Sequence, residues 1–379
     1  MRHVVTQNKG WALWLLALLL VVAAYRSPWI GARTTFAAPA VADSAANGKK
    51  VDRLFAAFIA KDEPGAAVIV IQRGKILHQA AYGLADVAAG IVLTPQHIFQ
   101  IGSVGKQFTA IAIMQLFQAG KLAYDDSIRT YLPELPAWAD AITIRHLLHH
   151  TSGLPDYTDA ILDKLFQRTD TPTNDDLIAV LSNLRKPGTP GEQFEYSNIG
   201  YDLLGSIIAR ISGQNFERYL DSHIFKPLGM QQTFSLPNAR RQQAKLVAHS
   251  YEEAEGEPYD SDPMDGLLGS GSVYSTVGDM YRYDQAFYSN KLVKQAILAE
   301  ALESGVLNDG SNTGYGFAFE LEMWQKKAYV AHSGAWLAFQ ADYVRFPQEQ
   351  LSVIVLLNRN YAIPDEPRLA LQVAKLYLD

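Results

Sequence analysis

Cysteine is absent from the 379-residue chain. Its absence removes thiol catalysis, cysteine-based zinc sites and disulfide bonds together. An excess of positive charge is missing too, because the formal net charge is −6 at pH 7. A basic face is the usual footprint of a nucleic-acid-binding protein. We therefore expect no nucleic acid as a partner.

Long hydrophobic runs are scarce. Residues 11–24 are uncharged and apolar, and Arg2 and Lys9 precede them. A 14-residue helix spans about 21 Å, short of a bilayer core of roughly 30 Å, but it fits the apolar part of a signal peptide. Residues 1–40 are thus expected to be a cleaved signal peptide or an N-terminal membrane anchor. A core helix is disfavoured by the basic flank and the tail rich in alanine, serine and threonine.

The remaining composition is that of a globular protein, with 48% hydrophobic and 19% charged residues. Residues 41–50 are predicted to be a linker, and residues 51–379 one domain that is large enough to need no disulfide or metal. Helical stretches broken by prolines dominate from about residue 121 to 260, which predicts an all-helical insertion.

Strand patterns occur on both sides of this insertion. Residues 66–71 and 76–82 are predicted to form a β-hairpin. After residue 314, three apolar runs separated by short turns predict an antiparallel meander, followed by a closing helix over residues 364–378. Both ends of the chain would then complete one antiparallel sheet flanked by helices. The expected fold class is α/β, more strictly α+β.

Ser103 and Lys106 begin a segment with a helical apolar period. Positions i and i+3 are neighbours on a helix. A serine hydroxyl needs a base to become a nucleophile, and a desolvated lysine can serve as one. The N–H groups at the helix start could hold an oxyanion. Alone, such a pair is more often an N-cap serine beside a solvated lysine, so the assignment depends on two further elements.

The second element is Tyr196-Ser197-Asn198, at a junction between a loop and a helix, where a phenol and an amide can project into a cleft. Ser197 or Asn198 could equally be a helix cap. The third element is His332-Ser333-Gly334, expected on an edge strand. Gly334 permits close approach of the backbone, and the N–H of Ala335 could be a second oxyanion donor.

The order S-x-x-K, Y-x-N, [KH]-[ST]-G resembles the three-motif pattern of the serine β-lactamases and penicillin-binding peptidases. The flanking sequences are similar to the branch that holds class C β-lactamases, D,D-peptidases and family VIII esterases: residues 99–108, 147–154, 187–198 and 314–317. The resemblance covers roughly residues 51–379. It implies a β-lactamase/transpeptidase-like fold and an acyl-serine mechanism without a cofactor.

The resemblance also assigns roles. Ser103 would be the nucleophile, Lys106 and Tyr196 would share acid–base work, and the N–H groups of Ser103 and Ala335 would bind the oxyanion. The substrate would be held by four residues: Asn198, His332, Ser333 and Gly334.

His332 departs from the β-lactamases of this branch, which have lysine there. A histidine is mostly neutral at pH 7. The pattern H-[ST]-G resembles esterases, D-amino-acid peptidases and some carboxypeptidases, so weak or no β-lactamase activity is expected. The substrate would be a D-amino-acid peptide or a carboxylic ester, with the cell wall as one source. A non-catalytic relative that binds peptidoglycan or acts as a scaffold is the alternative.

Three histidines, His146, His149 and His150, share a helix face, but no H-E-x-x-H or carboxylate pattern accompanies them. They are expected to end a helix rather than to bind metal. The protein is expected outside the cytoplasm: periplasmic, secreted, or anchored to the outer face of the cytoplasmic membrane. Membrane contact is expected only through residues 1–40.

Overall fold

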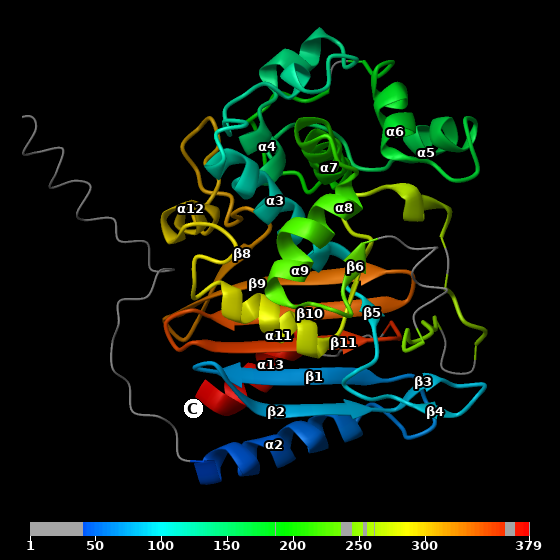
Figure 1. The fold of residues 1–379 in the computed structure, drawn as a ribbon, viewed down its shortest axis with the longest axis vertical. Helices are drawn as coiled ribbons and strands as arrows, with labels where there is room; N and C mark the ends of the chain where they lie inside the picture. The colour runs from blue at the N-terminus through cyan, green and yellow to red at the C-terminus, as the bar shows by residue number, and fades with distance from the viewer. Residues whose placement is uncertain are drawn as a thin grey trace, which may run out of the picture.

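The computed structural model describes residues 41–185, 187–235, 245–252, 256–260, 262–360 and 368–378. A six-stranded antiparallel sheet forms its centre, in the order β2-β1-β11-β10-β9-β8 (Figure 1). Both ends of the chain supply strands, as predicted. The bounds are β1 (Ala66–Gln72), β2 (Lys75–Tyr82), β8 (Glu320–Trp324), β9 (Lys327–Trp336), β10 (Phe339–Phe346) and β11 (Leu351–Leu357).

The sheet is buried on both faces at its middle strands. Every residue of β1 and β11 is buried, and both strands are nearly continuous apolar runs. Alternate residues of β1 enter two different cores: Val68 and Val70 pack with α2 (Val41–Ala56) and α13 (Leu369–Leu378), while Ile69 and Ile71 belong to the larger core on the other face. α11 (Val277–Ala286) covers that face, and α3 (Lys106–Gln118) contributes buried residues to the same core.

The expected linker over residues 41–50 is wrong, because these residues form the first part of α2. Their small and polar composition is poor for an isolated helix, but the helix docks on β2. Gly48 is buried there, and the Ser44 hydroxyl donates to the carbonyl of Leu77 at 3.2 Å. Tertiary packing thus decides the conformation over local propensity. Residues 1–40, with the expected signal peptide or anchor, lie outside the described residues.

Regular elements between residues 121 and 228 are helical in the described part of the chain. They comprise η2 (Ile128–Thr130), η3 (Ala137–Ala141), α4 (Ile144–Leu148), α5 (Asp159–Phe166), α6 (Asn174–Leu181), α7 (Asn198–Ser212), α8 (Phe216–Leu220), η4 (Asp221–Phe225) and α9 (Lys226–Leu228). In Figure 1, α4, α5, α6 and α7 sit above the β8–β9 side of the sheet, and α9 is drawn in front of it.

One strand interrupts the helical region that was expected to extend to about residue 260. It is β6 (Phe234–Ser235), which pairs with β7 (Val273–Ser275); β7 also pairs with β5 (Phe99–Gln100). The remaining elements are β3 (Leu84–Asp86), β4 (Ile91–Val92), η1 (Gly102–Gly105), η5 (Pro263–Gly266) and α12 (Gln295–Ala301).

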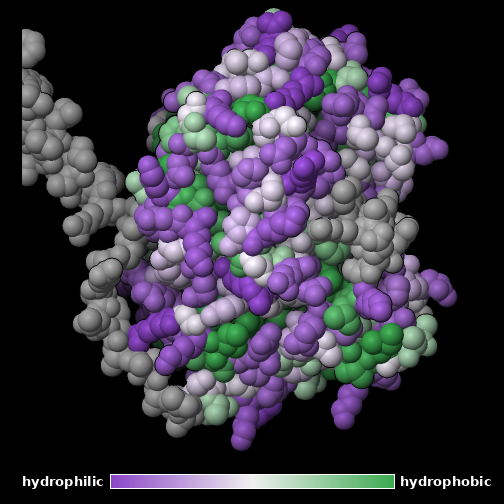
Figure 2. Space-filling model, viewed as in Figure 1, coloured by the Kyte–Doolittle hydropathy of each residue, from purple (hydrophilic) through white to green (hydrophobic). Residues whose placement is uncertain are grey.

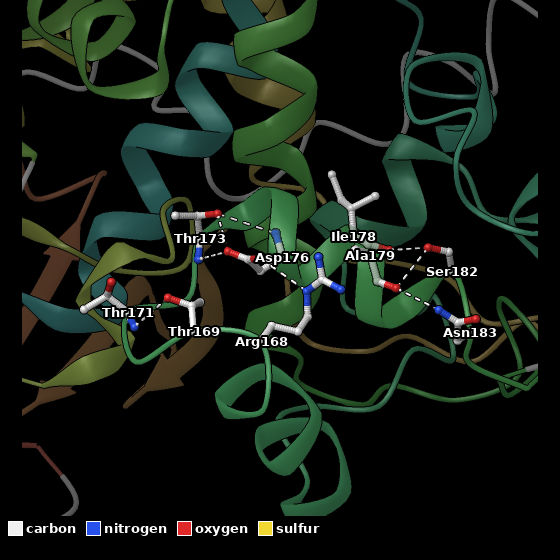
Figure 3. A network of polar contacts seen from close by, with 9 residues as sticks. All are labelled: Arg168, Thr169, Thr171, Thr173, Asp176, Ile178, Ala179, Ser182 and Asn183. Atoms are coloured by element: carbon white, nitrogen blue, oxygen red, sulfur yellow. Dashed lines mark hydrogen bonds and ion pairs between the residues drawn. The ribbon is translucent and has the colours of Figure 1, made fainter.

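Local hydrogen bonds fix the start of α6 (Figure 3). Thr173 caps the helix, and the carboxylate of Asp176 accepts from the backbone N–H of Thr173 at 3.1 Å and from its hydroxyl at 2.8 Å. Arg168 donates to the same carboxylate at 3.3 Å. This reciprocal cap holds the chain that enters α6 in one conformation.

The surface in Figure 2 is mostly hydrophilic, with a green patch at lower right over the β3–β4 hairpin. Ile91 and Val92 at that hairpin are 48% and 63% exposed. Among the helices that the structure describes, none has the length and apolar character needed to cross a bilayer.

Candidate active site

Two glycines bring the predicted nucleophile against the sheet. Gly102, in η1, has φ +49°, which favours glycine, and a Cβ there would lie 2.6 Å from the backbone nitrogen of Ala335. A Cβ on Gly334 would lie 2.9 Å from the backbone nitrogen of Ser103. This close approach of η1 and β9 places Ser103 and Ala335, the two expected oxyanion donors, on the wall of one cavity.

Lys106 is held by three oxygen atoms. Its Nζ lies 3.1 Å from Ser103 Oγ, 2.6 Å from Asn198 Oδ1 and 2.7 Å from the carbonyl oxygen of Ser270. The amide and carbonyl oxygens can only accept. A neutral amine has two N–H bonds, and these two oxygens take both. Its lone pair then faces Ser103 Oγ, the orientation that a general base requires.

Two carboxylates fix those acceptors. Asp156 accepts from the backbone N–H and the side-chain amide of Asn198, both at 2.9 Å, which leaves Asn198 Oδ1 for Lys106. Asp202, four residues after Asn198 on α7, accepts from the backbone N–H of Ser270 at 2.9 Å and from the Tyr157 hydroxyl at 2.7 Å. Asp202 thereby holds the Ser270 carbonyl in place.

Burial governs the charge of this group. Lys106 is fully buried, and burial lowers its pKa to about 7, while the carboxylates of Asp202 and Asp156 act in the opposite direction. Burial also raises the pKa of Asp202 to about 6, against its hydrogen bonds from Tyr157 and Ser270. A lysine that readily loses its proton near neutral pH suits the role of base.

Tyr196 lies over the same atoms. Its ring centroid is 4.9 Å from Lys106 Nζ. Among the described residues its hydroxyl is buried without a hydrogen-bond partner. Burial raises the pKa of Tyr196, and the nearby Ser103 hydroxyl only partly opposes this shift. The phenol is therefore protonated at neutral pH and suits a proton donor rather than the resting base.

His332 does not line the cavity, contrary to the expected contact with substrate. Its side chain is 2% exposed: Nδ1–H donates to the carbonyl of Ser333 at 2.6 Å, and Nε2 accepts from the Tyr315 hydroxyl at 2.8 Å. Burial, with a smaller influence of Lys106, lowers the pKa of His332 to about 3. The imidazole is neutral and supports Tyr315 from inside.

The phase of β9 explains this difference. His332 and Gly334 are buried, whereas Ser333 and Ala335 are exposed, as strand alternation requires. β9 is not an edge strand, but β8 pairs with it only as far as Ala331, so its last part is open on that side. Ser333 is exposed without lining the cavity, and Gly334 contributes close packing rather than a side chain.

The cavity at Ser103 is small, about 160 Å³. The indole N–H of Trp336 donates to Asp265 in η5 at 2.9 Å, which holds this turn beside β9. None of the described residues that line the cavity carries a cationic group. The lining residues are Gly102, Ser103, Tyr157, Asn198, Met264, Leu267, Ser270, Gly271, Ser272, Ala335 and Trp336.

The three neighbouring histidines do not converge. The Nδ1 atoms of His146 and His150 accept from the backbone N–H groups of Thr143 and Ser197, and Nδ1 of His149 donates to the carbonyl of Tyr315. In the part of the chain that the structure describes, no three metal-ligating side chains gather.

His150 is a positioning residue that the sequence reasoning missed. It has φ +57°, a strained value for a non-glycine residue. Its Nδ1 accepts from the N–H of Ser197 at 3.1 Å, and its ring centroid lies 4.2 Å from that of Tyr196, with the two rings tilted by 31°. Through these two contacts His150 fixes the positions of both Ser197 and Tyr196 in the second motif.

Four other residues were missed: Asp156, Tyr157, Asp202 and Trp336. Asp202 carried a usable signal, because its i+4 spacing from Asn198 puts both side chains on one face of α7. Asp156 and Tyr157 follow directly after the 147–154 flank, and nothing in the local sequence distinguishes Trp336 from a core residue.

Fold and site together define a β-lactamase/transpeptidase-like protein. A model of the family described as Beta-lactamase matches residues 51–378, and the chain belongs to that family.

Two similar proteins are named as penicillin-binding proteins, one of them as putative. Penicillin-binding protein 4* of Bacillus subtilis is 31% identical over 334 residues, covering 82% of this chain and 72% of that protein. The putative penicillin-binding protein PbpX of the same organism is 33% identical, covering 67% of this chain and 61% of its own length.

Solved structures are similar in fold. The octameric penicillin-binding protein homologue from Pyrococcus abyssi superposes with a TM-score of 0.72 at 27% identity, covering 83% of this chain and 74% of that chain. A class C β-lactamase superposes with a TM-score of 0.73, covering 90% and 98%, and its 21% identity shows the fold alone.

Proposed function

We propose that this protein is a serine hydrolase that forms an acyl-enzyme on Ser103 and acts on a carboxylic ester or a D-amino-acid peptide. One observation carries the proposal: Lys106 Nζ contacts Ser103 Oγ while its other two contacts are pure acceptors. Membership of the beta-lactamase family, whose members are serine hydrolases, supports the same chemistry.

The reaction follows from this geometry. As Ser103 Oγ attacks the substrate carbonyl carbon, its proton passes to the lone pair of Lys106. The N–H groups of Ser103 and Ala335 stabilise the oxyanion. When the bond to the leaving group breaks, the Tyr196 hydroxyl supplies the proton, and Lys106 reprotonates Tyr196.

Hydrolysis of the acyl-enzyme repeats these steps with water. The water oxygen attacks the ester carbonyl and gives its proton to Lys106. Ser103 Oγ then leaves and takes that proton back, which restores the starting state.

The size and the lining of the cavity favour a substrate with a small neutral acyl group. Its volume of about 160 Å³ is below the usual range of drug-sized sites. A carboxylate-bearing β-lactam would find no cationic partner among its described lining residues, and the neutral His332 supplies none. Weak or no β-lactamase activity is therefore part of the proposal.

A substrate panel tests the proposal: p-nitrophenyl butyrate, a D-Ala-D-Ala peptide, a D-amino-acid amide and nitrocefin. We expect turnover of the ester or of a D-amino-acid substrate, with kcat/KM at least tenfold above that for nitrocefin. If nitrocefin is the best substrate, the substrate assignment is wrong.

The alternative is a non-catalytic protein that binds peptidoglycan. A fluorophosphonate probe separates the two, because only an activated serine reacts. Labelling of the wild type and none of Ser103→Ala supports a hydrolase. Absence of labelling in a correctly folded wild type favours the binding protein.

A further inference from the structure

A second and larger cavity lies behind the turn that borders the catalytic cavity. Its volume is about 640 Å³, within the range of small-molecule sites. It is bounded by residues 171–175, by α7, by the start of α8 and by η5. α7 packs against both α6 and α8 (Figure 1). Met264 and Leu267 line the catalytic cavity, whereas Pro263 and Leu268 line the second one. One short turn therefore separates two cavities.

The walls of the second cavity are preformed. The side-chain amide of Asn174 donates to the carbonyls of Asp202 and Leu268 at 2.7 and 2.8 Å, and its oxygen accepts from the N–H of Leu268 at 2.8 Å. The Thr173–Asp176 cap fixes the adjoining segment (Figure 3). A ligand would thus meet a shaped site at little cost in ordering.

The charges on the wall do not balance. Arg210 is the cation among the described lining residues, and it already donates to Glu134 at 2.8 Å. Asp262 caps η5, and Asp265 accepts from Trp336. Two further carboxylates remain on this wall.

These two carboxylates are Asp175 and Glu217. Neither makes an ion pair with another described residue. The half-buried Ala209 and Leu268 and the exposed Pro263 supply apolar surface in the same cavity. Negative charge beside an apolar wall suits an ammonium group carried on a short apolar body.

We propose that this cavity binds a ligand with a primary ammonium group, held by Asp175 and Glu217, with its apolar part against Ala209 and Leu268. The ligand can be a free amine or the amino end of an extended substrate whose acyl carbon lies at Ser103. Binding itself does not rest on the proposed hydrolase function; only the kinetic measurement below does.

Calorimetric titration of the full-length Ser103→Ala variant with benzylamine tests the binding, with benzyl alcohol as the neutral probe of matched shape. We expect saturable binding of benzylamine alone. Asp175→Asn combined with Glu217→Gln should weaken it at least tenfold. Ala209→Phe should abolish it by filling the cavity. Asp163→Asn, an exposed change on α5, is the matched control and should bind normally.

Three results would overturn the site. They are equal binding of benzyl alcohol, unchanged binding by Ala209→Phe, and no saturable binding of benzylamine up to about 10 mM, where even weak sites are detected. Thermal unfolding of each variant separates loss of the site from loss of the fold.

Kinetics of the wild type distinguish the two sources of the amine. If benzylamine raises the KM of an amine-bearing D-peptide but not of p-nitrophenyl butyrate, the cavity takes the far end of the substrate. If it changes the KM of both, a separate ligand acts on the catalytic cavity through η5. Binding without any effect on either substrate would overturn the link through η5.

Discussion

Replacement of Asp202 by asparagine should move the pH dependence of catalysis to lower pH. The Asp202 carboxylate is buried and favours the charged form of Lys106. An asparagine Oδ1 can still accept from the N–H of Ser270, and its amide N–H can donate to the Tyr157 oxygen, so both contacts survive while the negative charge is removed. Without that charge the pKa of Lys106 falls further, so the amine becomes neutral, and therefore basic toward Ser103, at a lower pH.

The size of this fall in the pKa of Lys106 follows from its distance to Asp202, since Ser270 bonds both side chains. Contacts of 2.7 and 2.9 Å to the carbonyl and the N–H of that residue join the two charges. They place the charges roughly 6–8 Å apart, which at an effective dielectric constant of about 20 corresponds to about 2 kcal/mol. That energy is between about 1 and 2 pKa units.

The assay is the profile of kcat/KM against pH for p-nitrophenyl butyrate. In the wild type, activity should rise through a pKa near the value of about 7 that burial gives Lys106. In Asp202→Asn the rise should occur about 1–2 units lower. Asp163→Asn, the same change at an exposed position on α5, should leave the profile in place. A rise that stays put or moves upward in a folded Asp202→Asn variant would refute Lys106 as the titrating base.

Three further predictions concern other parts of the chain. His332→Lys buries an ammonium group near Lys106 and removes the acceptor for Tyr315, so it should destabilise the fold by about 3 kcal/mol in thermal or urea unfolding without improving nitrocefin turnover. A stable variant with better nitrocefin turnover would contradict the buried position of this side chain. His150→Phe keeps the ring but loses the acceptor for the Ser197 N–H, which costs about 1–3 kcal/mol, and should lower kcat more than it raises KM; His150→Asn, which can accept that bond, should recover part of kcat, and equal losses in both variants would argue for a purely structural role. Removal of residues 1–40 should abolish export from the native host while the remaining chain, which begins at α2, stays soluble and active; a full-length chain found in the cytosolic fraction would contradict export.

The local motifs could be predicted because their spacing alone decides the contact. Ser103 and Lys106 lie on adjacent turns of η1 and α3, so the i, i+3 spacing is enough to place them together. The same holds for the hairpin of β1 and β2 and for the meander of β9, β10 and β11, where alternating or apolar runs and short turns fix the pairing.

The long-range contacts could not be predicted in this way. Ser270 supplies a carbonyl to Lys106 only because Gly205 and Gly269 let its loop pack against the backbone of α7. Every residue has a backbone carbonyl, so the sequence does not indicate which one contacts Lys106. His332 shows a related difficulty. A strand pattern gives a period of two, but which set of side chains faces inward depends on the layers packed around β9.

Intact-mass analysis of the enzyme quenched during turnover of p-nitrophenyl butyrate tests the central claim most directly. The account predicts that the wild type gains the mass of one butyryl group, located on Ser103 by peptide mapping. Ser103→Ala should gain none, and Lys106→Met should neither acylate nor turn over at a measurable rate, because the base is gone. A butyryl group on another residue, or normal acylation of Lys106→Met, would contradict the assignment of Ser103 and Lys106 as nucleophile and base.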